Sequence, residues 1–244
     1  MRFVVLILFI GSLALSLDSC KKGGPCVLQS FTDTSINTTS TNTFTYTKGK
    51  VTREDELNNS YTTYHYNDAG VIDTVSNYDQ TGLLLSYDIY AYTGKNFSSK
   101  MTYSNTNGSG VLTLLLQRQY IYSGDSITRL NETLYSGGTT SATYTLFTYD
   151  GKGNIANARK YNTASSTLVY NRTYTYDTYS NPWGSLALYI DYFSLNNTLS
   201  QTDSQNPTSD ITYTYQYNGA GFPISMTESY ASNSKTETYN YNCP

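Results

Sequence analysis

The sequence has few of the residues from which active sites and metal sites are usually built. Its 244 residues include one histidine, three cysteines and one tryptophan, and charged residues make up 14% of the chain. Catalysis needs titratable groups that converge, and His65 would have to support a histidine site alone. No Cys-x-x-Cys, P-loop or Gly-x-Ser-x-Gly pattern occurs. We therefore expect no catalytic residue, no metal site and no cofactor, and expect His65 to be a surface or cross-strand residue.

Acidic residues are also sparse. Glu54-Asp55-Glu56 is the one acidic cluster, and adjacent strand or turn residues diverge, which favours a solvated turn over calcium ligation. A pair of carboxylates for glycoside hydrolysis stays open as a minor alternative, because its two members can come from distant strands. The formal net charge of −3 is mild and argues against a nucleic-acid partner.

Helical apolar patterns are missing beyond the first residues, so almost no helix is expected. Instead, residues 143–149 alternate between Thr and larger apolar or aromatic side chains, which is typical of a strand. Asp150-Gly151-Lys152-Gly153 follows, with the chemistry of a type I turn closed by a glycine bulge. The adjacent apolar residues Leu146 and Phe147 predict a bulge in the strand.

Looser copies of this unit recur along the chain. A tyrosine precedes each expected turn, at Tyr66, Tyr92, Tyr122, Tyr149, Tyr176 and Tyr217, with weaker end copies at Tyr46 and Tyr241. The expected strand pairs are 43–47 with 51–56, 61–66 with 71–78, 83–92 with 97–103, 111–122 with 127–135, 142–149 with 155–161, 167–176 with 185–194, and 211–217 with 223–230, followed by a strand at 236–243. The sequence thus predicts an all-β fold, an antiparallel meander of consecutive hairpin repeats in one curved or rolled sheet.

Two polar stretches are expected to be irregular. Residues 32–43 are Ser, Thr and Asn with one apolar residue, which predicts an exposed loop or weak edge strand. Residues 195–210 form the longest polar stretch and are the expected place for a ligand contact. The 27 tyrosines are expected on one face of the sheet and the threonines on the other.

The N-terminus has the pattern of a targeting segment. Arg2 precedes an apolar run that ends in Leu17-Asp18-Ser19-Cys20, which is too short for a comfortable transmembrane helix and resembles a bacterial lipobox. We expect a signal peptide at 1–19, an acylated (palmitate-bearing) Cys20, a tether at 20–25 and a single domain at 26–244. An ordinary secretory signal with an incidental Cys20 is the alternative.

The other two cysteines lie near opposite ends of the mature chain. In an oxidising compartment Cys26 and Cys243 are expected to form a disulfide. The bond would join the first strand, 26–31, to the last, 236–243, if the sheet brings its ends together. Two unrelated thiols are the alternative.

The segment Phe-Thr-Tyr-Asp-Gly-Lys-Gly-Asn-Ile at 147–155 resembles the tyrosine-aspartate (YD, or RHS-type) repeat, with looser copies over residues 43–241. In that family the repeats form continuous antiparallel sheet. The whole chain resembles tandem β-hairpin lipoproteins of Gram-negative cell envelopes. The resemblance implies an outer-membrane lipoprotein, on the periplasmic side or at the cell surface.

These observations predict a membrane-anchored, non-enzymatic protein with a scaffold or protein-contact role, in which edge strands accept a partner. The alternative is a glycan-binding module that stacks sugar rings on exposed tyrosines. Asp73-Thr74-Val75 and Asp125-Ser126-Ile127 look like an O-glycosylation pattern of some Gram-negative periplasms, although chance matches are expected in a chain rich in Ser and Thr.

Overall fold

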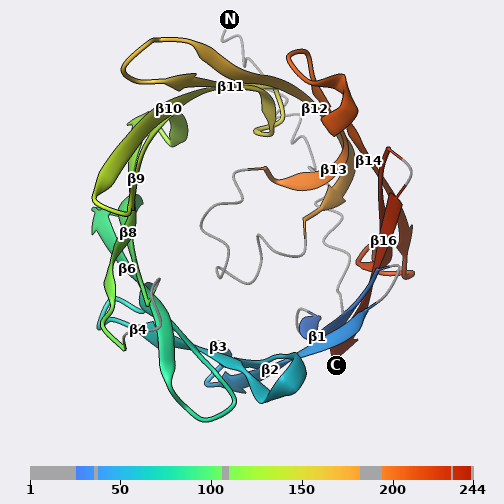
Figure 1. The fold of residues 1–244 in the computed structure, drawn as a ribbon. Coiled ribbons are helices and arrows are strands. Elements are labelled where there is room, and N and C mark those ends of the chain that lie inside the picture. The colour runs from blue at the N-terminus through green and yellow to red at the C-terminus, as the bar shows by residue number, and fades with distance from the viewer. Residues whose placement is uncertain (1–25, 36–37, 106–109, 182–193, 232, 243–244) are drawn as a thin grey trace, which may run out of the picture.

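The computed structural model describes residues 26–35, 38–105, 110–181, 194–231 and 233–242. In these residues sixteen strands follow one another around a closed barrel, and β16 pairs with β1. Figure 1 shows the ring of strands viewed along its axis. The predicted antiparallel meander of hairpins is confirmed, and the single curved or rolled sheet that the sequence predicts closes on itself into a barrel. Closure is a long-range property: it depends on the accumulated strand number and stagger, which no local pattern encodes.

The strands are β1 Val27–Thr34, β2 Thr39–Thr47, β3 Lys50–Asp55, β4 Tyr61–Tyr66, β5 Ile72–Tyr78, β6 Leu84–Thr93, β7 Asn96–Ser104, β8 Thr113–Ser123, β9 Ser126–Ser136, β10 Thr139–Tyr149, β11 Ile155–Asn162, β12 Leu168–Ser180, β13 Asn196–Asp203, β14 Ile211–Tyr217, β15 Pro223–Tyr230 and β16 Asn233–Asn242. Two three-residue 3-10 helices, Leu57–Asn59 and Pro207–Ser209, are the helical elements of the described residues. None of the helices described is long and apolar enough to cross a bilayer.

Six of the predicted strand pairs are confirmed, as β2–β3, β4–β5, β6–β7, β8–β9, β10–β11 and β14–β15. The pairing of 167–176 with 185–194 is wrong, because β12 pairs instead with β13, Tyr176 lying opposite Thr198. Most of 185–194, including the apolar run at 186–190, lies outside the described residues. The stretches 32–43 and 195–210 are largely strand. Polar side chains hid these strands, since a strand with paired neighbours on both sides tolerates low intrinsic β-propensity.

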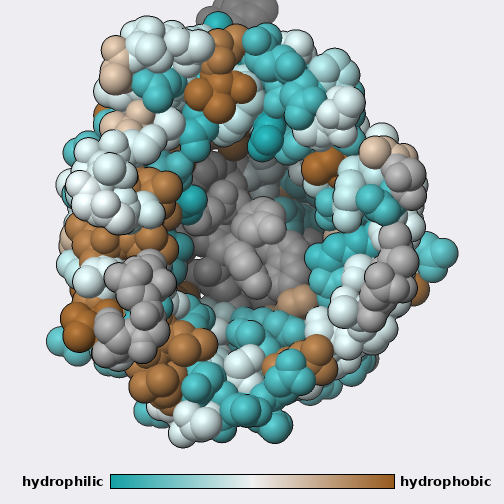
Figure 2. Space-filling view, viewed as in Figure 1, coloured by the Kyte–Doolittle hydropathy of each residue, from teal (hydrophilic) through white to brown (hydrophobic). Residues whose placement is uncertain are grey.

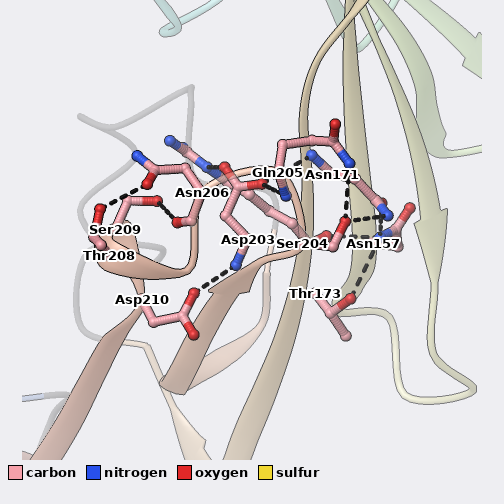
Figure 3. Close-up of polar contacts among 11 residues, drawn as sticks. Asn157, Asn171, Thr173, Asp203, Ser204, Gln205, Asn206, Thr208, Ser209 and Asp210 are labelled. Carbon is pink, nitrogen blue, oxygen red and sulfur yellow. Dashed lines mark hydrogen bonds and ion pairs between the residues drawn. The ribbon is translucent and has the colours of Figure 1, made fainter.

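The turn after β13 uses its polar side chains within itself and on its neighbours (Figure 3). The buried Asp203 accepts hydrogen bonds from the backbone N–H groups of Asn171 and Gln205. The backbone N–H of Asp203 donates to the Asp210 carboxylate at 2.7 Å. Nearby, the side-chain amide N–H of Asn157 donates a hydrogen bond to the side-chain oxygen of Asn171 at 2.8 Å. These bonds make the stretch a structural turn, so it is a weaker candidate for ligand contact than the sequence suggested.

Each tyrosine turn is built in the same way. At the strand pairs confirmed above, the register shifts by one residue just before the tyrosine, because the second strand carries one extra residue. In the β10–β11 hairpin the shift lies between Thr148 and Tyr149, and the extra residue is Ala156 of β11, so the bulge predicted at 146–147 is wrong in both position and strand. Asp150 Oδ1 accepts the backbone N–H groups of Lys152 and Asn154, and Gly153 has φ +89°, as the turn chemistry predicts.

The inner face of the ring is identified by its buried cluster. Leu28, Phe44, Val51, Ile72, Val75, Met226 and Tyr239 pack together, with tyrosines from β6 and β14 against them. These residues come from consecutive strands on both sides of the β16–β1 seam and form one continuous buried row on the concave face of the closed sheet, so they and the residues that alternate with them in register point inward. Five threonines of β2 point the other way and are exposed. Tyrosine, however, occurs on both faces, so the predicted division of Tyr from Thr between the two faces is only partly correct.

Inward tyrosines tie successive hairpins together. The hydroxyl of Tyr66 donates to the backbone carbonyl of Val51 at 2.9 Å, and that of Tyr149 donates to Ile127 at 2.9 Å. The same bond joins Tyr46 to Leu28, Tyr92 to Ile72 and Tyr176 to Ile155. We call these five bonds the tyrosine ladder. They explain the period of the sequence, because each acceptor carbonyl belongs to the preceding hairpin.

Candidate functional site

The interior of the barrel is lined by charged side chains as well as aromatic ones. Lys100 Nζ lies 2.8 Å from Asp88 Oδ2 on the inner face of β6 and β7. Glu132 lies between two cations, with Arg118 Nε at 2.9 Å and Lys160 Nζ at 2.8 Å. These side chains are between 14% and 24% exposed, so the ion pairs are shielded from bulk water and less screened than surface pairs.

A second, more acidic part of the lining lies where the barrel closes. Lys235 Nζ contacts Asp33 at 2.7 Å and Glu237 at 3.0 Å. Glu54 is 5% exposed and accepts hydrogen bonds from Asn42 at 2.7 Å and Tyr64 at 2.6 Å. Burial raises the pKa of the Glu54 carboxyl despite these two bonds, because removing the charged form from water costs more than two neutral donors return.

Glu132 is the contrasting case. Burial alone would raise the pKa of its carboxyl, but the hydrogen bonds and charges of Lys160 and Arg118 outweigh burial and hold that pKa below its usual value. The pKa values of the two glutamates are therefore shifted in opposite directions inside one barrel.

This contrast predicts opposite pH effects for two matched variants. A carboxyl whose pKa is raised in the folded state stabilises the fold below its unfolded pKa, and this stability is lost as pH rises. Glu54→Gln should therefore make the unfolding free energy decline less steeply above about pH 4.5. A lowered pKa contributes stability above the unfolded pKa, which is lost as pH falls. Glu132→Gln should therefore destabilise the protein at pH 7, by roughly 1–3 kcal/mol, and less at acid pH. Urea unfolding between pH 4 and 8 measures both, and parallel curves for the two variants would contradict the assignment.

A cavity of about 370 Å³ lies against the inner face between β8 and β14. Its described lining has four aromatic rings and several hydrogen-bonding groups: Phe147, Tyr174, Tyr176 and Tyr213, with Arg118, Asn181, Ser194, Thr198 and Gln201. Burial raises the pKa of Tyr174 to about 12, so its phenol is neutral at physiological pH. None of the lining residues described is a carboxylate. The cavity has the size and mixed lining of a small-ligand site.

The wall is least continuous beside this cavity. β13 and β14 share two paired positions, Ser200 with Thr212 and Gln201 with Ile211, and Figure 1 shows β13 on the inner side of this part of the ring. Gln201 and Thr198 of β13 both line the cavity. β13, which the sequence predicted to be irregular, thus supplies two of the polar groups of the site.

The outer wall carries tyrosines in a different arrangement. Pairs of rings stack across neighbouring strands, Tyr61 with Tyr78 at 4.8 Å, Tyr87 with Tyr103 at 4.8 Å and Tyr144 with Tyr161 at 5.1 Å between centroids. Arg53 covers the ring of Tyr61 at 3.8 Å, and Arg129 covers that of Tyr144 at 4.3 Å. These rings are occupied by cross-strand packing and cation–π contacts.

Figure 2 looks along the barrel from one end and shows that the visible rim of described residues is mostly hydrophilic, with apolar patches between the hydrophilic residues.

The residues singled out from the sequence have separate places. His65 is an exposed cross-strand residue, as expected, with its Nδ1 2.6 Å from Asp73. The acidic cluster is not a solvated turn: Glu54 is buried inward, Asp55 pairs with Arg53 on the other face, and Glu56 accepts a bond from Thr62. No group of potential metal ligands occurs in the part of the chain that the structure describes.

The cysteines lie at or beyond the ends of the described residues. Cys26 directly precedes β1, while Cys20 and Cys243 lie outside the described residues. The inner cavity had no sequence signal of its own, because its lining comes from seven strands and two strand ends. The alternation of Phe147 with Tyr149 and of Tyr174 with Tyr176 was the one available hint.

No protein-family model and no curated protein matches the chain. Among solved structures, a porin-like protein from Bacteroides uniformis matches with a TM-score of 0.58 at 14% identity, over 89% of this chain and 98% of that one. A porin-like protein from Bacteroides vulgatus matches with a TM-score of 0.52 at 12% identity, over 89% and 99% of the two chains. The fold is that of these porin-like barrels. At such identity the likeness concerns the fold alone.

The chain also aligns with part of a Photorhabdus luminescens Tc holotoxin pore structure, over 82% of this chain and 14% of that one, at a TM-score of 0.26. That value is too low to support a common architecture. The resemblance to tyrosine-aspartate repeats stays a prediction from the sequence of the hairpin unit.

Proposed function

We propose that the chain is a lipid-anchored, non-catalytic binding protein of the cell envelope, and that its porin-like barrel holds a saccharide ligand in the cavity between β8 and β14. The aromatic lining of that cavity carries the proposal. Sugar rings stack on aromatic faces and use planar amides and guanidinium groups as hydrogen-bond partners, and the cavity offers Tyr174 and Tyr213 beside Gln201 and Arg118. A volume of about 370 Å³ suits a mono- or disaccharide.

The outer wall supports attachment by lipid instead of insertion of the strands. The outward positions of β2 are all threonine and are exposed, and outward Arg53 and Arg129 sit over tyrosine rings. A barrel that spans a bilayer needs an apolar outer band, and an arginine at its midplane costs about 2–4 kcal/mol. These threonines and arginines favour contact with water, although apolar side chains such as Leu85 and Ile121 are also exposed on the outer wall, and we assign membrane attachment to the acylated Cys20.

A scaffold role that uses a sheet edge has less support. β-strand addition needs an unpaired edge, and the described strands form a closed ring. Stacked partners and arginines already cover the outer tyrosines. Tyr174 and Tyr176 also stack, at 6.5 Å between centroids, but both line the cavity. The interior is therefore the better candidate for the ligand.

A glycan array probed with the soluble form starting at Lys21 tests the proposal. We expect one class of saccharide to bind, and we expect Tyr213→Ala to reduce that binding at least tenfold, because removing the ring gives up about 1.5–3 kcal/mol of apolar burial against the sugar. Tyr144→Ala on the outer wall is the matched control and should leave binding unchanged. Loss with Tyr144→Ala but not Tyr213→Ala would move the site to the outer wall, and no binding to any saccharide would overturn the proposal.

A further inference from the structure

We infer that the barrel stands on an anionic lipid surface with one defined end, the end that carries the tyrosine turns. We call this end the tyrosine rim and the opposite end the far rim. The tyrosine rim has the turns at 48–49, 67–71, 94–95, 124–125, 150–154 and 218–222, and the far rim has those at 56–60, 79–83, 137–138, 163–167 and 204–210. The inference rests on the proposed lipid anchor and adds an orientation and a contact surface to it.

Strand topology places the start of the chain at the tyrosine rim. Val27 lies opposite Asn242, and β1 runs from there to the far rim, where it turns into β2. β2 then returns to the 48–49 turn of the tyrosine rim. The first and last described residues therefore lie at the same end of the barrel as the tyrosine turns.

The short tether restricts what the anchor can bring to the membrane. Six residues lie between Cys20 and Val27, so the seven Cα–Cα steps can span at most about 25 Å. β1, the strand beside the tether, has 8 residues and is about 26 Å long, so the lipid meets the tyrosine rim with a relaxed tether and can meet the far rim of an upright barrel only with the tether fully extended. A barrel lying on its side would press exposed threonines such as those of β2 against the bilayer, at a cost in lost hydration that a few outward apolar side chains such as Leu85 and Ile121 do little to offset.

The charges of the two rims also favour the tyrosine rim as the end that faces an anionic membrane. The turns of the tyrosine rim carry Lys48, Lys95 and Lys152 against Asp68, Asp125 and Asp150, with the exposed Lys50 at the start of β3, so this rim is close to neutral, and Lys95 pairs with Asp125 at 2.9 Å. The far-rim turns that the structure describes have Glu56, Asp79 and Asp210 and no lysine or arginine. A lysine near an anionic bilayer contributes about 1 kcal/mol of attraction. The acidic far rim is repelled by the same surface, so charge and tether favour one orientation.

Two positions on one strand allow a matched test. Ser126 and Ser136 are the first and last residues of β9, and both are exposed. The full-length lipoprotein, with a fluorescent unnatural amino acid at one of these positions, is reconstituted into vesicles of phosphatidylglycerol and phosphatidylcholine that contain nitroxide-labelled lipid. We expect quenching of the label at position 126 to exceed that at 136 at least twofold.

The controls separate orientation from anchoring. Cys20→Ala should leave the protein in the supernatant with neither label quenched. Replacing Lys48, Lys95 and Lys152 by Glu should reduce the difference between the labels in anionic vesicles and leave it unchanged in pure phosphatidylcholine. Equal quenching of both labels, or stronger quenching at 136, in a protein that sediments with vesicles would overturn the orientation alone. Failure of the unmodified chain to associate with vesicles would overturn the anchor and the orientation together.

Discussion

Replacing Cys26 with serine is expected to lower the free energy of unfolding by up to about 5 kcal/mol, the chain-entropy value for a loop of this length, with strain reducing it. The predicted bond to Cys243 closes a loop of 243 − 26 = 217 residues, and Val27 pairs with Asn242 at the seam where the barrel closes. For a domain of this size, 5 kcal/mol corresponds to a fall in Tm of about 10–20 °C. Thermal unfolding of the soluble form starting at Lys21 measures the change.

The partner cysteine provides the control. Cys243→Ser should match Cys26→Ser, and the double variant should be no less stable than either single one, because all three remove the same bond. Reductant should lower the Tm of the unmodified protein and leave that of the variants unchanged. Free thiols in the oxidised protein, detected by alkylation and mass spectrometry, would contradict the pairing and support two unrelated thiols.

The sequence predicted the hairpins of this barrel well and its closure poorly, for a physical reason. A turn such as Asp150–Gly153 is encoded by four neighbouring residues, so its chemistry could be predicted from the sequence and is seen in the structure. Pairing of β1 with β16 depends on the whole ring. The two cysteines were the only reason to expect that the first and last strands lie side by side, and that expectation held only if the sheet brings its ends together.

The same distinction applies to the candidate site. Alternation of polar and apolar residues predicts which strand side chains share a face, but it does not say that β8 and β14 face each other across an interior. Arg118 and Tyr213 line one cavity although 95 residues separate them (213 − 118). β13 was missed because Asn196–Asp203 is almost entirely polar, and only its place between β12 and β14 makes it a strand.

Removing the hydroxyls of the tyrosine ladder is expected to have an effect as large as removing the disulfide. The bulge in each second strand disrupts the ladder of backbone hydrogen bonds, and the phenol of the next hairpin donates to a carbonyl there, as Tyr92 does to Ile72 at 2.7 Å. Each Tyr→Phe change should cost about 0.5–1.5 kcal/mol, or more where the carbonyl stays unpaired. The five positions are spaced two strands apart, about 10 Å, so their effects should add to roughly 3–7 kcal/mol.

A matched five-fold variant separates the ladder from a general effect of losing phenols. Phenylalanine at Tyr61, Tyr78, Tyr87, Tyr103 and Tyr144 removes the same number of hydroxyls from stacked rings of the outer wall, and it should change the unfolding free energy by less than about 1 kcal/mol. Equal losses in the two variants would show that the inward bonds have no special role.

Alkaline unfolding tests the same bonds without mutation. Burial raises the pKa of Tyr149 to about 12, and burial likewise raises that of Tyr46 to about 12. A raised folded-state pKa contributes stability that is fully present below the unfolded value near 10 and is lost as pH rises toward 12. The unmodified protein should therefore lose stability steeply above pH 10, and the ladder variant should lose less, because the hydroxyls that must stay protonated in the fold are gone. The outer-wall variant should follow the unmodified protein, since the same inward phenols remain to be ionised.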